Sequence, residues 1–165
     1  MNAATTSVSF VAPEQRTVLE RLWQLYTHDL SEFRGSMPDG EGLYQSGRLP
    51  LYFDDHDRCG YLIWSGSALA GFALIRGLRA KSRVMGEFFV VRAARRQHVG
   101  HEAALELLGL HPGPWEIAFQ EENAGAARFW RRVATDAVGQ AWTEAPRPVR
   151  GKPAIPPDVW LLLNL

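Results

Sequence analysis

Residues 88–104, FFVVRAARRQHVGHEAA, join a β-branched and aromatic run to a segment with alanine and leucine at helical spacing. The run is typical of a strand and the later segment of a helix, so the basic residues lie in a strand-to-helix loop. The first N–H groups of a helix lack partners within the helix, and the helix dipole places positive charge at that end. The stretch therefore predicts a loop that binds an anion such as a phosphate or diphosphate.

Side chains strengthen this prediction. Arg92, Arg95 and Arg96 add full positive charges, and Gly100 lets the backbone approach a ligand closely. The stretch matches neither the GxxxxGK[S/T] loop of nucleotide hydrolases nor the GxGxxG turn of dinucleotide folds. Basic residues beside a helix start also occur in turns that only contact solvent. On this loop alone both interpretations stay open.

The segments on either side of the loop predict an α/β (α+β) fold. Three strands in succession, at 61–65, 68–76 and 83–91, argue against a uniformly alternating, doubly wound sheet. We expect a mixed, mostly antiparallel central sheet flanked by about four helices, in a single domain over residues 1–165. Further strands are expected at 7–11, 114–120, 140–144 and 159–165, and helices at 13–30, 99–108 and 124–133, with one helical turn near 42–47.

Composition excludes some classes of protein. The 165 residues include 18 basic and 18 acidic side chains, so overall charge supplies no general affinity for nucleic acid. No apolar run approaches the roughly 20 residues that span a bilayer, and MNAATTSVSF lacks the features of a signal peptide. We therefore expect a cytoplasmic protein with no membrane partner. The acidic run 54–57 lacks metal-ligand spacing, so it favours a solvated loop and no metal site.

Two motifs resemble those of the GNAT superfamily of acyl-CoA-dependent N-acyltransferases. FFVVRAARRQHVG is similar to the family's strand and R/Q-x-x-G-x-G/A loop, and ENAGAARFW, residues 122–130, is similar to its N-x-x-A-x-x-F-Y element. The resemblance covers residues 60–133 well and the N-terminal strand and helix loosely. It implies transfer of an acetyl group from acetyl-CoA to a primary amine of a small molecule or peptide. In the family the amine attacks the thioester directly, in a cleft where two neighbouring strands separate.

The resemblance also implies which residues bind acetyl-CoA. Backbone groups of Phe89 and Val90 would bond the pantetheine arm, and an amide near Val90 would polarise the thioester carbonyl. Asn123 either contacts the pantetheine end or only caps its helix. The diphosphate would lie on the loop formed by Arg95, Arg96, Gln97, His98, Val99, Gly100 and His101.

The chain departs from the family pattern at two positions. His98 stands where the family has the first glycine of the loop, and a left-handed backbone there would cost a histidine on the order of 1 kcal/mol. Trp130 stands where a tyrosine often serves as general acid, and an indole N–H has no useful acidity. Either one of the phenols Tyr26, Tyr44 and Tyr52 replaces that acid, or the thiolate leaves unaided, since a thiol pKa of about 8.5 makes it a good leaving group.

Candidate residues for the acceptor amine lie upstream of the loop. Glu87 is the predicted general base, acting through a water molecule, since burial would raise its pKa toward the working range. Its alternative is a carboxylate on an exposed strand face or paired with Arg83. Tyr26, Asp29 and Glu32 would suit a cationic amine, whereas the alternative for these charges is a solvated helix end.

Other functions compete with acetyl transfer. His98 and Trp130 together motivate an acyl-CoA-binding module with weak or no catalysis. The arginines of 92–96 and 128–132 suggest nucleic-acid binding, which the neutral overall charge disfavours, so no nucleic-acid partner is expected. The terminal strand VWLLLNL offers an edge for pairing in a homodimer.

Overall fold

A computed structural model describes residues 4–165. Seven strands form one sheet in the order β1-β2-β3-β4-β5-β7-β6. Every neighbouring pair is antiparallel except β4 and β5, which are parallel. The elements are β1 (Thr6–Phe10), η1 (Pro13–Gln15), α1 (Arg16–Arg34), α2 (Leu51–Asp54), β2 (Arg58–Ser65), β3 (Ala68–Arg76), β4 (Arg83–Val90), η2 (Arg92–Ala94), α3 (Val99–Leu110), β5 (Pro114–Phe119), α4 (Ala124–Val138), β6 (Trp142–Arg147) and β7 (Asp158–Asn164).

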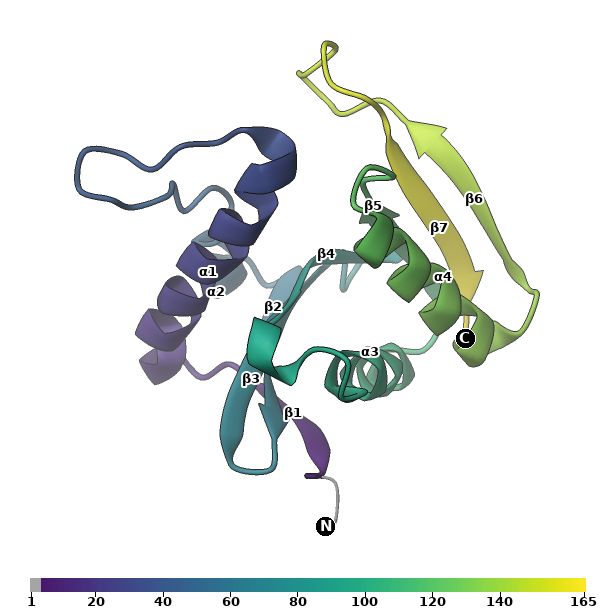
Figure 1. Ribbon diagram of the computed structural model, residues 1–165. Coiled ribbons are helices and arrows are strands. Elements are labelled where there is room, and N and C mark those ends of the chain that lie inside the picture. The colour runs from purple at the N-terminus through teal and green to yellow at the C-terminus, as the bar shows by residue number, and fades with distance from the viewer. Residues whose placement is uncertain (1–3) are drawn as a thin grey trace.

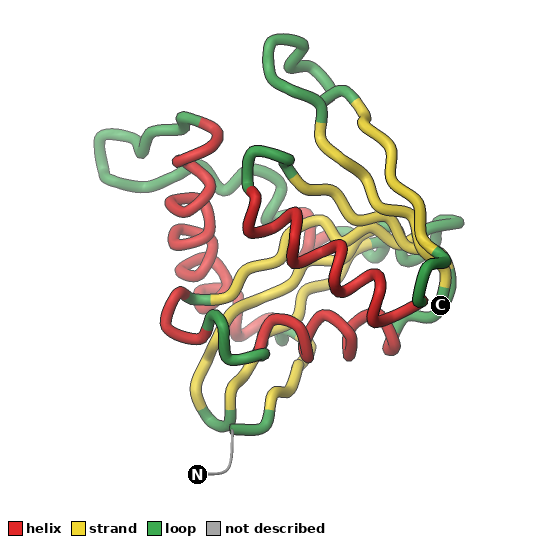
Figure 2. Tube along the Cα trace, turned by 45° about the vertical axis from the view of Figure 1, so that its right-hand side comes forward, coloured by secondary structure: helices red, strands yellow, loops and turns green. Residues whose placement is uncertain are grey.

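Helices cover both faces of the sheet. Helices α1 and α2 lie on one face, and α3 and α4 lie on the other (Figure 1). The same two layers are visible when the molecule is turned (Figure 2). This mixed sheet with its helices confirms the predicted fold class.

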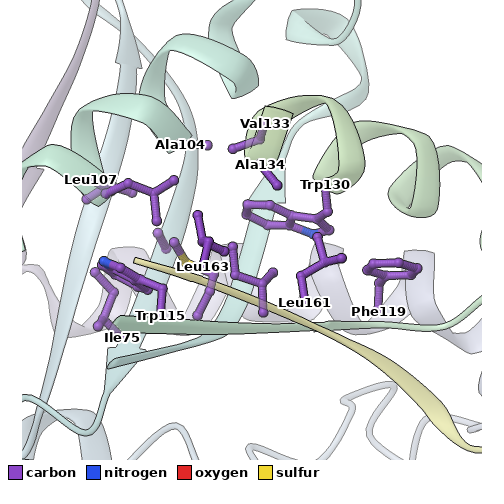
Figure 3. Close-up of a cluster of buried hydrophobic side chains, with 14 of the residues drawn as sticks. Ile75, Ala104, Leu107, Trp115, Phe119, Trp130, Val133, Ala134, Leu161 and Leu163 are labelled. Atoms are coloured by element: carbon purple, nitrogen blue, oxygen red, sulfur yellow. The ribbon is translucent and has the colours of Figure 1, made fainter. Parts of the chain in front are cut away.

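Each face of the sheet has its own apolar core. Beneath α1, Leu19, Leu22 and Trp23 pack against Phe72 and Leu74 of β3. Beneath α3 and α4, alanine and leucine side chains pack against the inner residues of β5 and β7 (Figure 3). Burial of these side chains is the main force that fixes both helical layers on the sheet.

The parallel pair β4 and β5 separates part-way along its length. Pairing is confined to Arg83–Met85 of β4 and Trp115–Ile117 of β5. Beyond these residues β4 continues to Val90 and β5 to Phe119 without pairing to each other. The unpaired edges leave a gap at one end of the sheet, as the resemblance implied.

A bulge in β4 sets the orientation of the residue next to this gap. Leu74 pairs with Glu87 and Ile75 with Met85, so Gly86 is the extra residue. A Cβ atom at position 86 would collide with the hydroxyl of Tyr52. Glycine at this position leaves room for the Tyr52 hydroxyl, and the bulge places Glu87 on the α1 face of the sheet, near Tyr26.

Several predicted boundaries were wrong. The helical turn expected near 42–47 lies instead at Leu51–Asp54, directly after Pro50, a residue suited to a helix start. Helix α1 continues to Arg34 and α4 to Val138, both beyond the expected ends. Gly109 lies inside α3 rather than ending it. Helices α1 and α4 end at Gly35 and Gly139, which adopt φ of 66° and 64°, a conformation that glycine adopts without strain.

The proposed dimer edge was also wrong. Strand β7 pairs with β5 on one side and with β6 on the other, so it has no free edge. The outer strands of the sheet are β1 and β6. In the part of the chain that the structure describes, no helix combines the length and apolarity that crossing a membrane requires.

Candidate active site

A cleft of about 900 Å³ lies beside the gap between β4 and β5. Its walls come from α1, the end of β4, the 95–101 loop and α4. It brings together most of the predicted residues, namely Tyr26, Asp29, Glu32, Phe89, Val90, Arg95, Arg96, His98, Gly100, His101 and Asn123. A second cavity of about 280 Å³, next to Tyr52 and Phe53, includes none of the predicted site residues.

The loop before α3 presents a run of free backbone N–H groups. Arg96 and His98 both adopt left-handed backbone conformations, with φ of 63° and 64°. Among the described residues, no hydrogen-bond acceptor meets the backbone N–H of any residue from 96 to 101. Left-handed residues in a tight turn direct successive N–H groups into a concavity that binds anions. The loop thus has the geometry of an anion site. His98 adopts the left-handed conformation that the sequence led us to consider, and this conformation strains a histidine.

Close packing explains the glycine of this loop. A Cβ atom on Gly100 would lie 3.2 Å from Cγ2 of Val90 and 3.5 Å from Cε2 of Phe129. The neighbouring Val99 is buried among Ile63, Ala70 and Ala103. The first turn of α3 is therefore held against the end of β4 and against α4, which fixes the free N–H groups beside the cleft. Gln97 and Val99 do not line the cleft with their side chains.

The arginines of the loop are held by an aspartate of α1. Arg92 donates to Oδ1 of Asp29 from Nε at 3.1 Å and from Nη2 at 2.8 Å. Arg95 donates to Oδ2 of Asp29 from Nη2 and to the carbonyl of Val90 from Nε at 2.8 Å. Partial burial raises the pKa of Asp29, but the hydrogen bonds from Arg95 and Arg92 outweigh this and hold the pKa below its ordinary value.

This pairing corrects the expectation for Asp29. The carboxylate lies at the cleft, but two guanidinium groups already occupy both of its oxygens. A carboxylate neutralised in this way offers little attraction to a cationic amine. Asp29 instead connects α1 to the segment that leads into α3.

The free edge of β4 carries polar groups into the gap. The N–H of Val91 donates to the carbonyl of Ala70 in β3. Successive strand residues direct their polar groups to opposite edges, so Val90 and Phe88 direct theirs away from β3, toward the gap. Phe89 directs its backbone groups toward Phe72 of β3. The edge that faces the gap therefore belongs to Phe88 and Val90, with the Val90 carbonyl already bonded to Arg95. The expectation for the backbone of Phe89 was wrong, since it faces β3 and only the side chain of Phe89 is left to line the cleft.

Glu87 and Tyr26 form a hydrogen-bonded pair. The hydroxyl of Tyr26 in α1 donates to Oε2 of Glu87 in β4, across 61 residues of sequence. Tyr26 lines the cleft, and Glu87 is not among the lining residues that the structure describes. The carboxylate therefore lies behind the phenol, neither freely exposed on a strand face nor paired with Arg83.

Burial shifts the pKa of both members of this pair upward. Desolvation raises the pKa of Glu87 above its ordinary value of 4.5, and the Tyr26 hydrogen bond and the charges of Arg48 and Arg76 oppose that rise. Desolvation and then the nearby Glu87 carboxylate raise the pKa of Tyr26 well above 10. The phenol therefore stays protonated at neutral pH, and the carboxylate is a stronger base than an exposed glutamate.

Trp130 belongs to the core as much as to the cleft. Its side chain is 6% exposed and lies between α4 and Leu161 of β7 (Figure 3). Its ring contacts Phe88 and Phe129 at centroid distances of 5.1 Å and 4.8 Å. Packing thus explains an indole at this position without an acid–base role.

At the start of α4, Asn123 has a structural role. Its Oδ1 accepts a hydrogen bond from the N–H of Ala126 at 3.1 Å, which caps the helix. The capping alternative is therefore present, while Asn123 also lines the cleft.

The far end of α1 contains a contact that the sequence did not indicate. Arg34 donates to Asp158 of β7 at 3.0 Å, across 124 residues. Glu32 lines the cleft close by and is exposed. The Arg34–Asp158 pair joins the α1 side of the molecule to the β7 side.

Comparison with known proteins supports a fold assignment. No protein-family model and no curated protein matches the sequence. Solved structures do match. An acetyltransferase from Thermus thermophilus is 16% identical over 100% of both chains, with a TM-score of 0.70. A probable acetyltransferase of the GNAT family from Chromobacterium violaceum is 18% identical over 99% of this chain and 90% of that one, with a TM-score of 0.68.

A third structure was solved with a ligand. The PaiA N-acetyltransferase from Thermoplasma acidophilum, in complex with coenzyme A, is 10% identical over 98% of this chain and 99% of that one, with a TM-score of 0.67. This chain has the GNAT fold. At these identities the likeness is one of fold, and it agrees with the fold that the two sequence motifs implied.

Proposed function

We propose that this protein transfers an acetyl group from acetyl-CoA to a primary amine of a small molecule or peptide. The observation that carries the proposal is the run of free N–H groups at 96–101, beside a cleft of about 900 Å³ at the gap between β4 and β5. The GNAT fold and the coenzyme A complex of the Thermoplasma structure support the same cofactor. No metal is part of the proposal.

The loop and the strand edge divide the binding of acetyl-CoA between them. The N–H groups of residues 96–101 would bind the diphosphate, helped by the positive end of α3. Arg96 and Arg128 line the cleft and have no carboxylate partner among the described residues, so their charges are available to the phosphates. The polar edge of Phe88 and Val90 would bond the pantetheine arm, and the Val90 amide would stabilise the developing oxyanion.

Glu87 would act as the general base. An ammonium group must lose a proton before its nitrogen can attack the thioester carbonyl, and the raised pKa of Glu87 suits that task. The attack forms the C–N bond and breaks the C–S bond. The second nitrogen proton neutralises the thiolate, so Trp130 has no proton to supply.

One experiment separates transfer from binding alone. Isothermal calorimetry would measure coenzyme A affinity, and a thiol-release assay would measure turnover of acetyl-CoA against a panel of primary amines. We expect micromolar binding together with amine-dependent thiol release. Binding without thiol release for any amine would favour the acyl-CoA-binding module, which the missing tyrosine at Trp130 motivates. No binding at all would contradict both functions.

A further inference from the structure

The position of Tyr26 gives it direct access to the acceptor end of the cleft. Its hydroxyl is hydrogen-bonded to Glu87, and its side chain lines the cleft where the carboxylate does not. A ligand in the cleft therefore meets the phenol first. Among the described residues, the Tyr26 hydroxyl is the only group that donates a hydrogen bond to the Glu87 carboxylate, so it alone connects that carboxylate to the cleft.

Aromatic packing holds the phenol in this position. The ring of Tyr26 lies 5.3 Å from that of Trp23, 5.6 Å from that of Phe72 and 6.1 Å from that of Phe89. The contacts with Phe72 and Phe89 are edge-to-face, an arrangement that stabilises ring orientation. These three neighbours come from α1, β3 and β4, so the hydroxyl is fixed relative to the sheet.

Three arginines and a second tyrosine lie near the Tyr26–Glu87 pair and act on its pKa values. Arg48 from the loop before α2 and Arg76 from β3 act on Glu87, and Arg34 from α1 acts on Tyr26. Tyr52 from α2 lies near Glu87, and its hydroxyl contacts Gly86. Its side chain lines the cavity of about 280 Å³ and not the cleft. Arg48 and Arg76 favour the ionised form of Glu87, which is the form that accepts a proton, and they oppose the larger rise in its pKa that burial causes.

We propose that Tyr26 is a catalytic residue that passes the acceptor's proton to Glu87, in place of a water molecule. The phenol oxygen takes a proton from the substrate ammonium as the phenol proton moves to Oε2 of Glu87. One N–H bond breaks, one O–H bond forms on the carboxylate, and the phenol ends as it began. The neutral amine then attacks the thioester, and Glu87 later releases its proton to solvent.

This inference rests on the proposed acetyl transfer and has its own test. Tyr26→Phe keeps the ring and its packing but removes the relay oxygen. We expect turnover to fall about 100-fold, within the range of general acid–base catalysis, with coenzyme A affinity within twofold of wild type. Tyr52→Phe is the matched control, since it removes a buried phenol beside Glu87 but outside the cleft, and it should stay within threefold of wild type.

A double-mutant cycle identifies the path of the proton. If Tyr26 acts through Glu87, Tyr26→Phe combined with Glu87→Gln loses no more activity than the more damaging single change. The single Glu87→Gln variant should also lose the rise in activity with pH that titration of the carboxylate produces. Tyr26→Phe turnover within threefold of wild type, or losses that multiply in the double variant, would overturn the relay. Coenzyme A binding with no turnover by the wild type would instead overturn the proposed function.

Discussion

The two ends of the cleft are built in different ways. At the end beside α3, the proposed anion site is main chain: six consecutive described residues, 96–101, present free N–H groups at the start of the helix. At the end beside α1, the proposed acceptor site depends on side chains that meet across long stretches of sequence. Tyr26, which lines the cleft, donates a hydrogen bond to Glu87 across 61 residues of sequence. A site made of backbone N–H groups keeps its hydrogen-bond donors whatever side chains it carries, such as Arg96 and His98. A site made of side chains loses its function when one of them is replaced.

The largest expected effect comes from filling the space beside the cofactor end. Gly100→Val would push γ-methyl groups into Val90 and Phe129, where even a Cβ atom is tightly placed. The loop would move, and we expect coenzyme A affinity to fall about 100-fold, which is about 2.7 kcal/mol, as measured by calorimetry.

The same helix offers a control for this change. A Cβ atom on Gly109 meets nothing within 4 Å, so Gly109→Val should leave coenzyme A affinity within twofold of wild type. Equal losses in the two variants would show that the effect is general to α3 and would remove the special role of Gly100.

A smaller effect is expected where the two ends meet, at Asp29. Asp29→Asn leaves Arg92 and Arg95 without a charged partner, and we expect the free energy of unfolding to fall by about 1 kcal/mol at neutral pH, measured by urea titration. The Michaelis constant for the amine should stay unchanged, because the arginines already occupy the carboxylate. A large rise in that constant would restore the prediction that Asp29 binds the amine.

The effect of Asp29 also has a defined pH dependence. Its pKa is lowered in the folded protein, so the ionised form is the one that folding favours. The stabilisation is therefore complete above the ordinary pKa of 3.8 and is lost as the pH falls through the lowered value. Wild type and Asp29→Asn should thus converge in stability only under strongly acidic conditions. A difference that disappears already near neutral pH would contradict the ion pairs.

The smallest expected effect is a gain in stability. His98 has a φ of 64°, so His98→Gly would relieve left-handed strain while adding entropy to the unfolded chain, for a net gain of about 0.5 kcal/mol. His101 lies in the first turn of α3 without a positive φ, and its Nε2 lies 2.7 Å from Oδ2 of Asp136, so His101→Gly should instead lower the free energy of unfolding by about 1 kcal/mol. Urea titration of both variants checks the contrast, and a loss of stability in His98→Gly would contradict it.

The difference between the two ends also explains what the sequence could predict. The strand, loop and helix at 88–104 follow from local patterns, so the element order and the position of the loop before α3 were predicted correctly. The helix ends at Arg34, Leu110 and Val138 were not, although Gly35 and Gly139, both at positive φ, end α1 and α4 by a local signal.

Side-chain partners were harder to predict, because they come from segments that lie far apart in the sequence. Glu87 could be recognised as an isolated carboxylate in an apolar strand, but nothing local shows that Tyr26 covers it. The pairing of Asp29 with Arg92 and Arg95 depends on how α1 crosses the sheet next to the loop. Such contacts follow only from the assembled fold.

The most direct test of the account is to observe the loop amides during ligand binding. Two-dimensional 15N–1H NMR would follow the backbone N–H signals of residues 96–101 as coenzyme A, and separately pantetheine, are added. We predict large shifts of these signals with coenzyme A and small shifts with pantetheine, which lacks the diphosphate. Unchanged 96–101 signals at saturating coenzyme A would contradict the claim that these amides hold the diphosphate.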